Sequence, residues 1–217
     1  MQRATIVPFM DDHTPPEPIS ISHVADDNLL FIRRMMSLSR EFAAVSGFAM
    51  ALTGVLALSG AWFATRQPDT RGWLQVWLAL AVVCAVAGFT GMIVKSRRTG
   101  QPLTRGAGRR FLFQFSAPMV AGAALTVLFA QHGLEAFLPA VWMLLYGTAV
   151  LSASAYSLRI IPIMGTAFVT MGVLACLVPD ALLPLPGHVR ITDLLLAASF
   201  GGFHILFGTM LARRQED

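Results

Sequence analysis

The stretch Trp73–Val94, "WLQVWLALAVVCAVAGFTGMIV", contains no Asp, Glu, Lys or Arg. About 20 apolar residues in a helix cross the hydrocarbon core of a bilayer. Because lipid offers the backbone no hydrogen-bond partners, such a segment must pair its own amide and carbonyl groups, as a helix does. The stretch therefore predicts a transmembrane helix.

Five further runs of similar length also lack these four residue types: Phe42–Ala64, Phe111–Ala130, Ala136–Tyr156, Ile160–Val178 and Leu194–Ala212. The chain of 217 residues is 55% hydrophobic and 13% charged, whereas an average soluble domain is about 25% charged. Six uncharged segments would leave a soluble helical protein no polar face for water, and transmembrane strands are shorter and alternate in polarity. We therefore predict an all-α, polytopic membrane helix bundle with six transmembrane helices over residues 42–214.

The basic residues fall unequally on the two sides of these spans. Only Arg66, Arg71 and Arg190 lie on one side, and the other 13 of the 16 Lys and Arg residues lie on the opposite side. Basic residues are retained on the cytoplasmic side of short loops, so both termini are predicted to be cytoplasmic. All four tryptophans then fall near the outer leaflet, where the membrane interface favours them.

One cytoplasmic loop, between the second and third spans, is strongly basic. It anchors the orientation of the chain, or it binds anionic inner-leaflet lipid or an acidic partner. Its glycines do not follow a strand and match no phosphate-binding loop, and no nucleic-acid partner is expected. The loop's basic residues are Lys95, Arg97, Arg98, Arg105, Arg109 and Arg110.

The segment before the first span is amphipathic. Residues 26–41 predict a helix with Phe31, Met35 and Leu38 on one face, and such a helix lies in the headgroup plane and is attracted to anionic lipid. A docking surface for a cytoplasmic protein is the alternative interpretation. Residues 1–25 are Pro-rich and without apolar periodicity, which predicts a disordered cytoplasmic tail. The basic face of the amphipathic helix comprises Arg33, Arg34 and Arg40.

Small residues recur within the spans at helix-packing distances, which lets helix backbones approach closely. The glycines predicted to serve this packing are Gly47, Gly88, Gly201, Gly202 and Gly208. Two polar side chains, His204 and Gln114, lie within spans, where polar groups usually face the bundle interior. For His204 we expect a neutral ring that is hydrogen-bonded to a neighbouring span, and either a packing role or a ligand or proton site.

Residues for catalysis are scarce. The six uncharged runs contain no carboxylate, and no metalloprotease or hydrolase motif occurs. Cys84 and Cys176 are predicted to lie at different depths, which argues against a disulfide, and no Cys or His cluster has metal-ligand spacing. We predict no catalytic residue, no cofactor and no metal, and the sequence leaves the oligomeric state open.

Two segments, "DNLLFIRRMM" near the start and "FGGFHILFGTMLARR" near the end, resemble a group of small bacterial six-span membrane proteins. In that group the patterns D-N-L-x-F-I-R and G-G-x-H-I-x-F-G recur, and no activity is assigned to it. The resemblance covers Asp27 to Arg214. It implies a multi-pass protein of the bacterial inner (plasma) membrane, and it implies no mechanism.

Three function classes remain from the sequence. The first is a non-enzymatic membrane component or regulatory subunit that binds a partner through its cytoplasmic residues. The second is a small-molecule transporter or channel, which needs polar groups that converge near the midplane; Gln114, Thr90, Tyr146 and His204 are the candidates. The third is a membrane enzyme centred on His204.

Overall fold

The computed structural model describes residues 29–30, 45–100, 102–154, 159–178 and 190–216. Leu29 and Leu30 are helical and exposed. The rest of the predicted amphipathic helix, with its three arginines, and the predicted tail over residues 1–25 lie outside the described residues. The chain from Ser39 to Asp217 forms one unit, and it contains every span.

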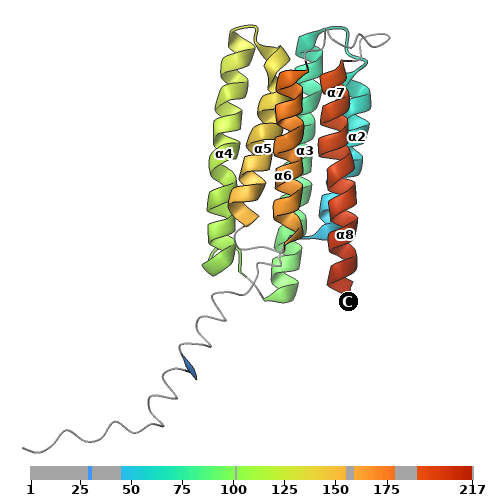
Figure 1. Cartoon of the computed structure of the whole chain (residues 1–217). Coiled ribbons are helices and arrows are strands. Elements are labelled where there is room, and N and C mark those ends of the chain that lie inside the picture. The colour runs from blue at the N-terminus through green and yellow to red at the C-terminus, as the bar shows by residue number, and fades with distance from the viewer. Residues whose placement is uncertain (1–28, 31–44, 101, 155–158, 179–189, 217) are drawn as a thin grey trace, which may run out of the picture. The chain divides into compact units, whose positions relative to one another are not determined.

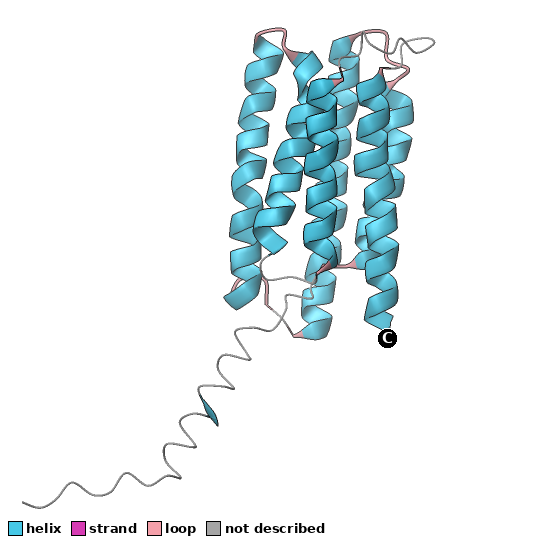
Figure 2. Ribbon diagram, viewed as in Figure 1, coloured by secondary structure: helices cyan, strands magenta, loops and turns pink. Residues whose placement is uncertain are grey.

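Helices make up this unit, and they run side by side (Figures 1 and 2). Among the described residues, six helical segments are long and apolar enough to cross a membrane. The predicted all-α fold with six spans is thus confirmed, and the chain is a multi-pass integral membrane protein. In chain order the elements are α2 (Gly47–Ala64), α3 (Thr70–Thr99), α4 (Gly106–Gln131), η1 (Glu135–Phe137), α5 (Leu138–Ser154), α6 (Ile160–Leu177), α7 (Ile191–Leu196), η3 (Ala197–Phe203) and α8 (His204–Glu216).

Local signals explain where helices begin and end. The Asp69 carboxylate accepts a hydrogen bond from the Gly72 amide at 2.7 Å and so caps the start of α3. The Ser46 hydroxyl accepts one from Ala49 at 3.3 Å before α2. At Gly100 the backbone enters the left-handed region with φ of 66°, which ends α3 as glycine does at many helix C-termini.

The last span is one continuous rod of three parts. It begins as the short α7, widens into the π-helical segment η3, and continues as α8. π-Helical segments are rare and frequently occur at functional sites. η3 lies in the middle of the span, immediately before His204.

The helices pack as two groups. In the first group α2 packs against both α3 and the last span, and in the second α5 packs against both α4 and α6. The two groups meet where α5 and α6 contact the last span, whereas the described residues of α3 and α4 barely touch. Figure 1 shows α4 at one edge of the bundle and α2 at the other.

Glycines bring the backbones of α2 and the last span into direct contact. A Cβ atom at Gly47 would lie 2.6 Å from the Gly208 carbonyl oxygen, and one at Gly54 would lie 2.7 Å from that of Gly201. Such distances admit no side chain, so these small residues set the helix separation. Gly47, Gly201 and Gly208 of the predicted set all lie at this contact.

A second glycine contact, between α5 and α6, was not predicted from the sequence. A Cβ at Gly147 would lie 2.9 Å from the Gly165 carbonyl oxygen, and one at Gly172 would lie 2.9 Å from the Leu144 backbone nitrogen. Gly165 and Gly172 recur at a seven-residue spacing on α6. This spacing is the signal that could have identified the contact.

Gly88 and Gly202 differ from the packing expectation. Nothing among the described residues lies within 4 Å of a Cβ placed at either position. Gly88 instead faces a cavity, because α3 has no helix opposite it there. Small-residue spacing alone did not distinguish these positions from true contacts.

Three of the four tryptophans lie together at one end of the bundle, but they face its interior and not the lipid. Trp73 and Trp77 are buried, and the Trp73 and Trp142 rings stack with centroids 5.6 Å apart and planes 3° from parallel. These tryptophans fill the interior at one end of the bundle. Trp62 remains 59% exposed, and the Arg66 guanidinium lies 3.7 Å from its ring centroid. Trp62 alone of the four has the exposure expected of an interfacial anchor.

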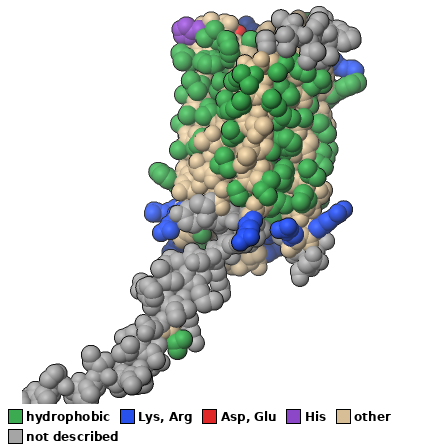
Figure 3. Space-filling view, viewed as in Figure 1, with side chains coloured by type: hydrophobic (Ala, Val, Ile, Leu, Met, Phe, Trp, Pro, Cys, Tyr) green, Lys and Arg blue, Asp and Glu red, His purple; other side chains and the backbone are tan. Residues whose placement is uncertain are grey.

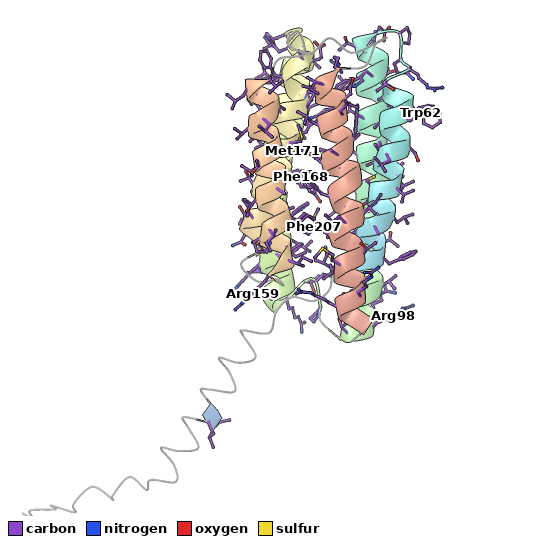
Figure 4. The ribbon with its side chains drawn as sticks, turned by 45° about the vertical axis from the view of Figure 1, so that its right-hand side comes forward. Trp62, Arg98, Arg159, Phe168, Met171 and Phe207 are labelled. Atoms are coloured by element: carbon purple, nitrogen blue, oxygen red, sulfur yellow. The ribbon has the colours of Figure 1, made fainter. Side chains whose placement is uncertain are left out.

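The opposite end of the bundle is basic. Figure 3 shows Lys and Arg side chains gathered at the end where α8 finishes, with hydrophobic side chains over the length of the helices. Arg98 and Arg159 both lie at this end (Figure 4). One basic group reaches inward: Lys95 Nζ donates to the Val45 carbonyl oxygen at 3.3 Å.

Candidate functional site

A cavity of about 450 Å³ lies between the two helix groups. Residues from all six spans line it, and α3 and α4 contribute the most. Its walls are mainly alanine, leucine, methionine and phenylalanine side chains, and none of its lining residues is Asp, Glu, Lys or Arg. An apolar wall with a few placed polar groups is typical of small-molecule sites.

At mid-depth the cavity is bordered by an aromatic–histidine cluster, defined as Tyr146, Phe168, Phe200 and His204. The Tyr146 ring centroid lies 4.7 Å from that of Phe168 and 5.3 Å from that of Phe200. The Phe200 and His204 rings are stacked 14° from parallel at 6.1 Å. Figure 4 shows Phe168 between the helices, whereas Trp62 points away from them.

The hydrogen bond expected for His204 is present. The Tyr146 hydroxyl of α5 and His204 Nε2 lie 2.7 Å apart, so the bond joins the two helix groups across the bundle. Tyr146 belongs to the polar residues predicted from the sequence, but its pairing with His204 was not predicted.

η3 determines the surroundings of the imidazole ring. The backbone carbonyl groups of Ser199 and Phe200 lie beside the His204 ring. His204 Nδ1 is nevertheless buried without a hydrogen bond of good geometry to any described residue. The Ser199 hydroxyl is directed elsewhere, with its oxygen 3.2 Å from Met143 Sδ.

Trp77 supplies a second unpartnered polar atom. Its side chain is 5% exposed and lines the cavity, and its Nε1 is buried without a partner among the described residues. The neighbouring indoles differ: Trp73 Nε1 donates to Asp193 at 2.8 Å, and Trp142 Nε1 donates to Thr126 at 2.9 Å. A buried donor without an acceptor costs free energy, and this nitrogen has almost no accessible surface, so it does not open into the cavity.

Asp193 is the buried carboxylate of the tryptophan-rich end. It is 3% exposed and accepts hydrogen bonds from Trp73 Nε1 and from the Arg190 amide, the latter at 3.0 Å. The Arg190 guanidinium also lies 3.3 Å from it as an ion pair. This network closes the start of the last span and does not line the cavity.

The cavity reaches the surface of the bundle between α3 and α4. Leu78 and Phe89 of α3 line it and are nevertheless 43% and 46% exposed, and the lining residue Ala123 of α4 is also exposed. All three residues lie within the apolar part of their spans. The opening therefore faces the hydrocarbon region of a membrane.

Of the other residues considered from the sequence, two lie apart from this site and one lines the cavity. Gln114 is half-buried, with its Oε1 unpartnered among the described residues, but it does not line the cavity. Thr90 is exposed on α3 and is also absent from the lining. Cys84 lines the cavity, and its Sγ lies 3.7 Å from the Thr53 carbonyl oxygen. Of the predicted midplane groups, the structure brings together only Tyr146 and His204.

The described part of the chain holds no cluster of three His, Cys, Asp or Glu residues suited to a metal ion. Comparisons with protein-family models, with curated proteins and with solved structures found no match.

Proposed function

We propose that this integral membrane protein is a non-enzymatic component of the bacterial inner membrane that binds a small, mostly apolar molecule in its central cavity. The observation that carries the proposal is the cavity, which residues from all six spans line without any charged side chain. Its volume of about 450 Å³ falls within the range of small-molecule sites. The bacterial setting rests on the resemblance of the two quoted segments.

The basic end of the bundle is proposed to face the cytoplasm, together with both termini. The excess of Lys and Arg at that end supports this orientation. Anionic inner-leaflet lipid is the expected neighbour of these side chains. A cytoplasmic protein partner is proposed to bind the same end, where α8 finishes with Arg213 and Arg214. Because α8 also contains His204, occupancy of the cavity and the partner-binding end are joined by one helix.

Saturable binding of a neutral apolar probe tests the proposal. The protein is placed in phosphatidylcholine nanodiscs and titrated with aminoanthracene, which is read by energy transfer from tryptophan. Trp77 and Trp142 line the cavity, so a bound probe lies close to two donors. We expect saturable binding above the signal of protein-free nanodiscs.

A matched pair of glycine variants locates the binding. Gly88→Leu adds a side chain at the cavity wall, and Gly202→Leu adds the same side chain in open space away from the cavity. We expect Gly88→Leu to weaken aminoanthracene binding at least tenfold and Gly202→Leu to leave it unchanged. Equal binding by the two variants would mean that the probe lies elsewhere, and the proposal would then fail.

A small-molecule transporter is the second candidate, and one observation favours it. The last span is interrupted by η3 beside the cavity, and transporters often form their sites at irregular segments of transmembrane helices. Transport differs from simple binding in one checkable respect, because it requires water to reach the site.

Cys84 reports on water access. In a Cys176→Ser background it is the single cysteine, and it lines the cavity. A cavity that exchanges only with lipid should react with membrane-permeant N-ethylmaleimide and not with a charged methanethiosulfonate reagent. Labelling by the charged reagent in sealed vesicles would instead support the transporter.

A further inference from the structure

We propose that the cavity binds an anionic phospholipid, with one acyl chain between α3 and α4 and the phosphate beside Lys95 at the basic end of the bundle. This inference rests on the proposed ligand-binding function and names the chemical class of the ligand. Three features lead to it: an opening to lipid along one side of the cavity, an interior without an accessible unpaired polar group, and a partly buried ammonium group at one end.

The cavity is open along its lipid-facing side. The lining residues Leu78, Ala81, Ala85 and Phe89 recur along α3 and are all exposed, so the opening follows this helix for about 16 Å. The described residues of α3 and α4 barely touch, and these helices therefore lie farther apart than the about 8–10 Å between the axes of packed helices. An acyl chain of a bilayer lipid can enter from the side without leaving the membrane.

The polar side chains that line the cavity are bonded within the protein. The Tyr146 hydroxyl is paired with His204, and Trp142 Nε1 donates to Thr126. Trp77 Nε1 and His204 Nδ1 lack partners among the described residues, but both atoms have almost no accessible surface and do not open into the cavity. Because a polar ligand group would lose its hydrogen bonds to water there without replacement, the part of the ligand between the helices is hydrocarbon.

Small side chains of α3 line the half of the cavity nearest to the basic end. Half of the hydrocarbon core of a bilayer is about 15 Å thick, which corresponds to about ten residues of helix. Counted back from Met92, this stretch contains the lining residues Cys84, Ala85 and Gly88. A Cβ placed at Gly88 would have nothing within 4 Å among the described residues. This half of the cavity therefore has room for a chain whose head group lies at the basic end.

Lys95 lies where the cavity meets the basic end. It follows the lining residue Met92 by one turn on the same face of α3, and its Nζ donates to the carbonyl oxygen of Val45, which also lines the cavity. An ammonium group has three donors, so further donors remain for a phosphate. Arg109 of α4 is exposed just before the lining of that helix begins. Residues 95–110 contain no Asp or Glu, and basic pockets between transmembrane helices bind anionic lipid head groups.

Competition between aminoanthracene and bilayer lipid tests the class of ligand. The probe is titrated into nanodiscs of dioleoyl phosphatidylcholine and into nanodiscs that also contain an equal amount of dioleoyl phosphatidylglycerol, which has the same chains. The probe is uncharged, so membrane charge neither attracts nor repels it. We expect its apparent Kd to rise by about fivefold or more with phosphatidylglycerol. Glycerol 3-phosphate, which has the phosphate without a chain, should not displace the probe.

A matched pair of variants locates the head group. Lys95→Gln removes the charge and keeps a donor for the Val45 carbonyl oxygen. Arg97→Gln removes an equal charge from an exposed position on the opposite side of α3. Loss of a charge-assisted hydrogen bond lowers affinity about tenfold, so Lys95→Gln should bind the probe almost equally in the two kinds of nanodisc. Arg97→Gln should keep the wild-type difference. Unchanged probe binding by Lys95→Gln in phosphatidylcholine alone is the check that this variant is folded.

Failure of this inference can be told apart from failure of the proposed function. If aminoanthracene binds and Gly88→Leu blocks it, but both lipid compositions give the same Kd, the function stands and the anionic phospholipid is overturned. Equal behaviour of Lys95→Gln and Arg97→Gln would overturn the position of the head group, and displacement by glycerol 3-phosphate would overturn the lipid. Probe binding in detergent micelles but not in phosphatidylcholine nanodiscs would overturn the preference for anionic lipid. Absence of saturable probe binding in both settings removes the proposed function itself.

Discussion

The hydrogen bond between Tyr146 and His204 is a direct polar link between the two helix groups, and Tyr146→Phe removes it. The two atoms are 2.7 Å apart, and His204 is only 7% exposed. The phenylalanine ring keeps the position of the tyrosine ring against Phe168 and Phe200. The substitution therefore removes one hydroxyl and leaves the aromatic packing in place.

The size of the effect follows from what His204 loses. Its Nδ1 already lacks a hydrogen bond among the described residues. Tyr146→Phe removes the partner of Nε2, and both ring nitrogens are then unpartnered. An unsatisfied buried polar group costs about 1–3 kcal/mol, whereas hydrogen bonds between membrane helices average about 0.6 kcal/mol and reach about 1.7. We expect Tyr146→Phe to lower the free energy of unfolding by about 1 kcal/mol.

A double-mutant cycle isolates this bond. His204→Leu alone leaves the Tyr146 hydroxyl unpartnered, whereas the double variant leaves neither polar group behind. Replacement of both partners by apolar groups is often nearly neutral, so the double variant should lose about 1 kcal/mol less than the sum of the singles. His204→Asn, which keeps hydrogen-bonding ability, should retain more stability than His204→Leu.

Unfolding in mixed micelles with rising dodecyl sulfate, followed by tryptophan fluorescence and circular dichroism, measures these differences. Thr148→Val is the matched control, because its hydroxyl is exposed on α5 and donates within its own helix to Leu144 at 2.7 Å. It should change stability by less than about 0.5 kcal/mol and be additive with His204→Leu. Additivity of Tyr146→Phe with His204→Leu within about 0.5 kcal/mol would refute the proposed coupling.

Three other perturbations have expected outcomes. Gly54→Leu should lower the free energy of unfolding by about 2–3 kcal/mol, because its Cβ would lie 2.7 Å from the backbone of α8; in the same assay Gly202→Leu should stay near wild type, and equal losses would contradict the packing argument. Asp193→Ala should cost about 2–3 kcal/mol, because Trp73 Nε1 loses its acceptor and the partly exposed Arg190 loses its ion pair; a neutral result would mean that water replaces the carboxylate. A reporter enzyme active only outside the cytoplasm should work when inserted at the His132 loop and remain silent at the C-terminus, and activity at the C-terminus would reverse the proposed orientation.

The sequence alone predicted the fold class and the six spans because both depend on local composition. A run without charges must be helical in lipid wherever its neighbours lie, so Trp73–Val94 could be assigned in isolation. His204 could be singled out in the same way, since an ionisable residue in an apolar run is costly unless it faces a partner. The contact between α2 and the last span was also partly predicted, through Gly47, Gly201 and Gly208.

The site itself required the tertiary structure. Tyr146 and His204 are separated by 58 residues, and no spacing within one helix shows which span will face another. For the same reason the sequence predicted the depth of Trp73, Trp77 and Trp142 near the outer leaflet but not that their side chains face the interior of the bundle.

The cavity is the clearest example of a feature that the sequence did not predict and the tertiary structure determined. Each span is apolar on every side, so its composition does not tell a lipid-facing surface from a helix contact or a cavity wall. Gly88 and Gly54 have the same residue type in similar surroundings along the chain, yet one borders the cavity and the other touches the backbone of the last span. Composition determined that these helices lie in the membrane. Only their packing against one another decided which face of each helix forms the site, because that choice depends on close contacts between distant segments.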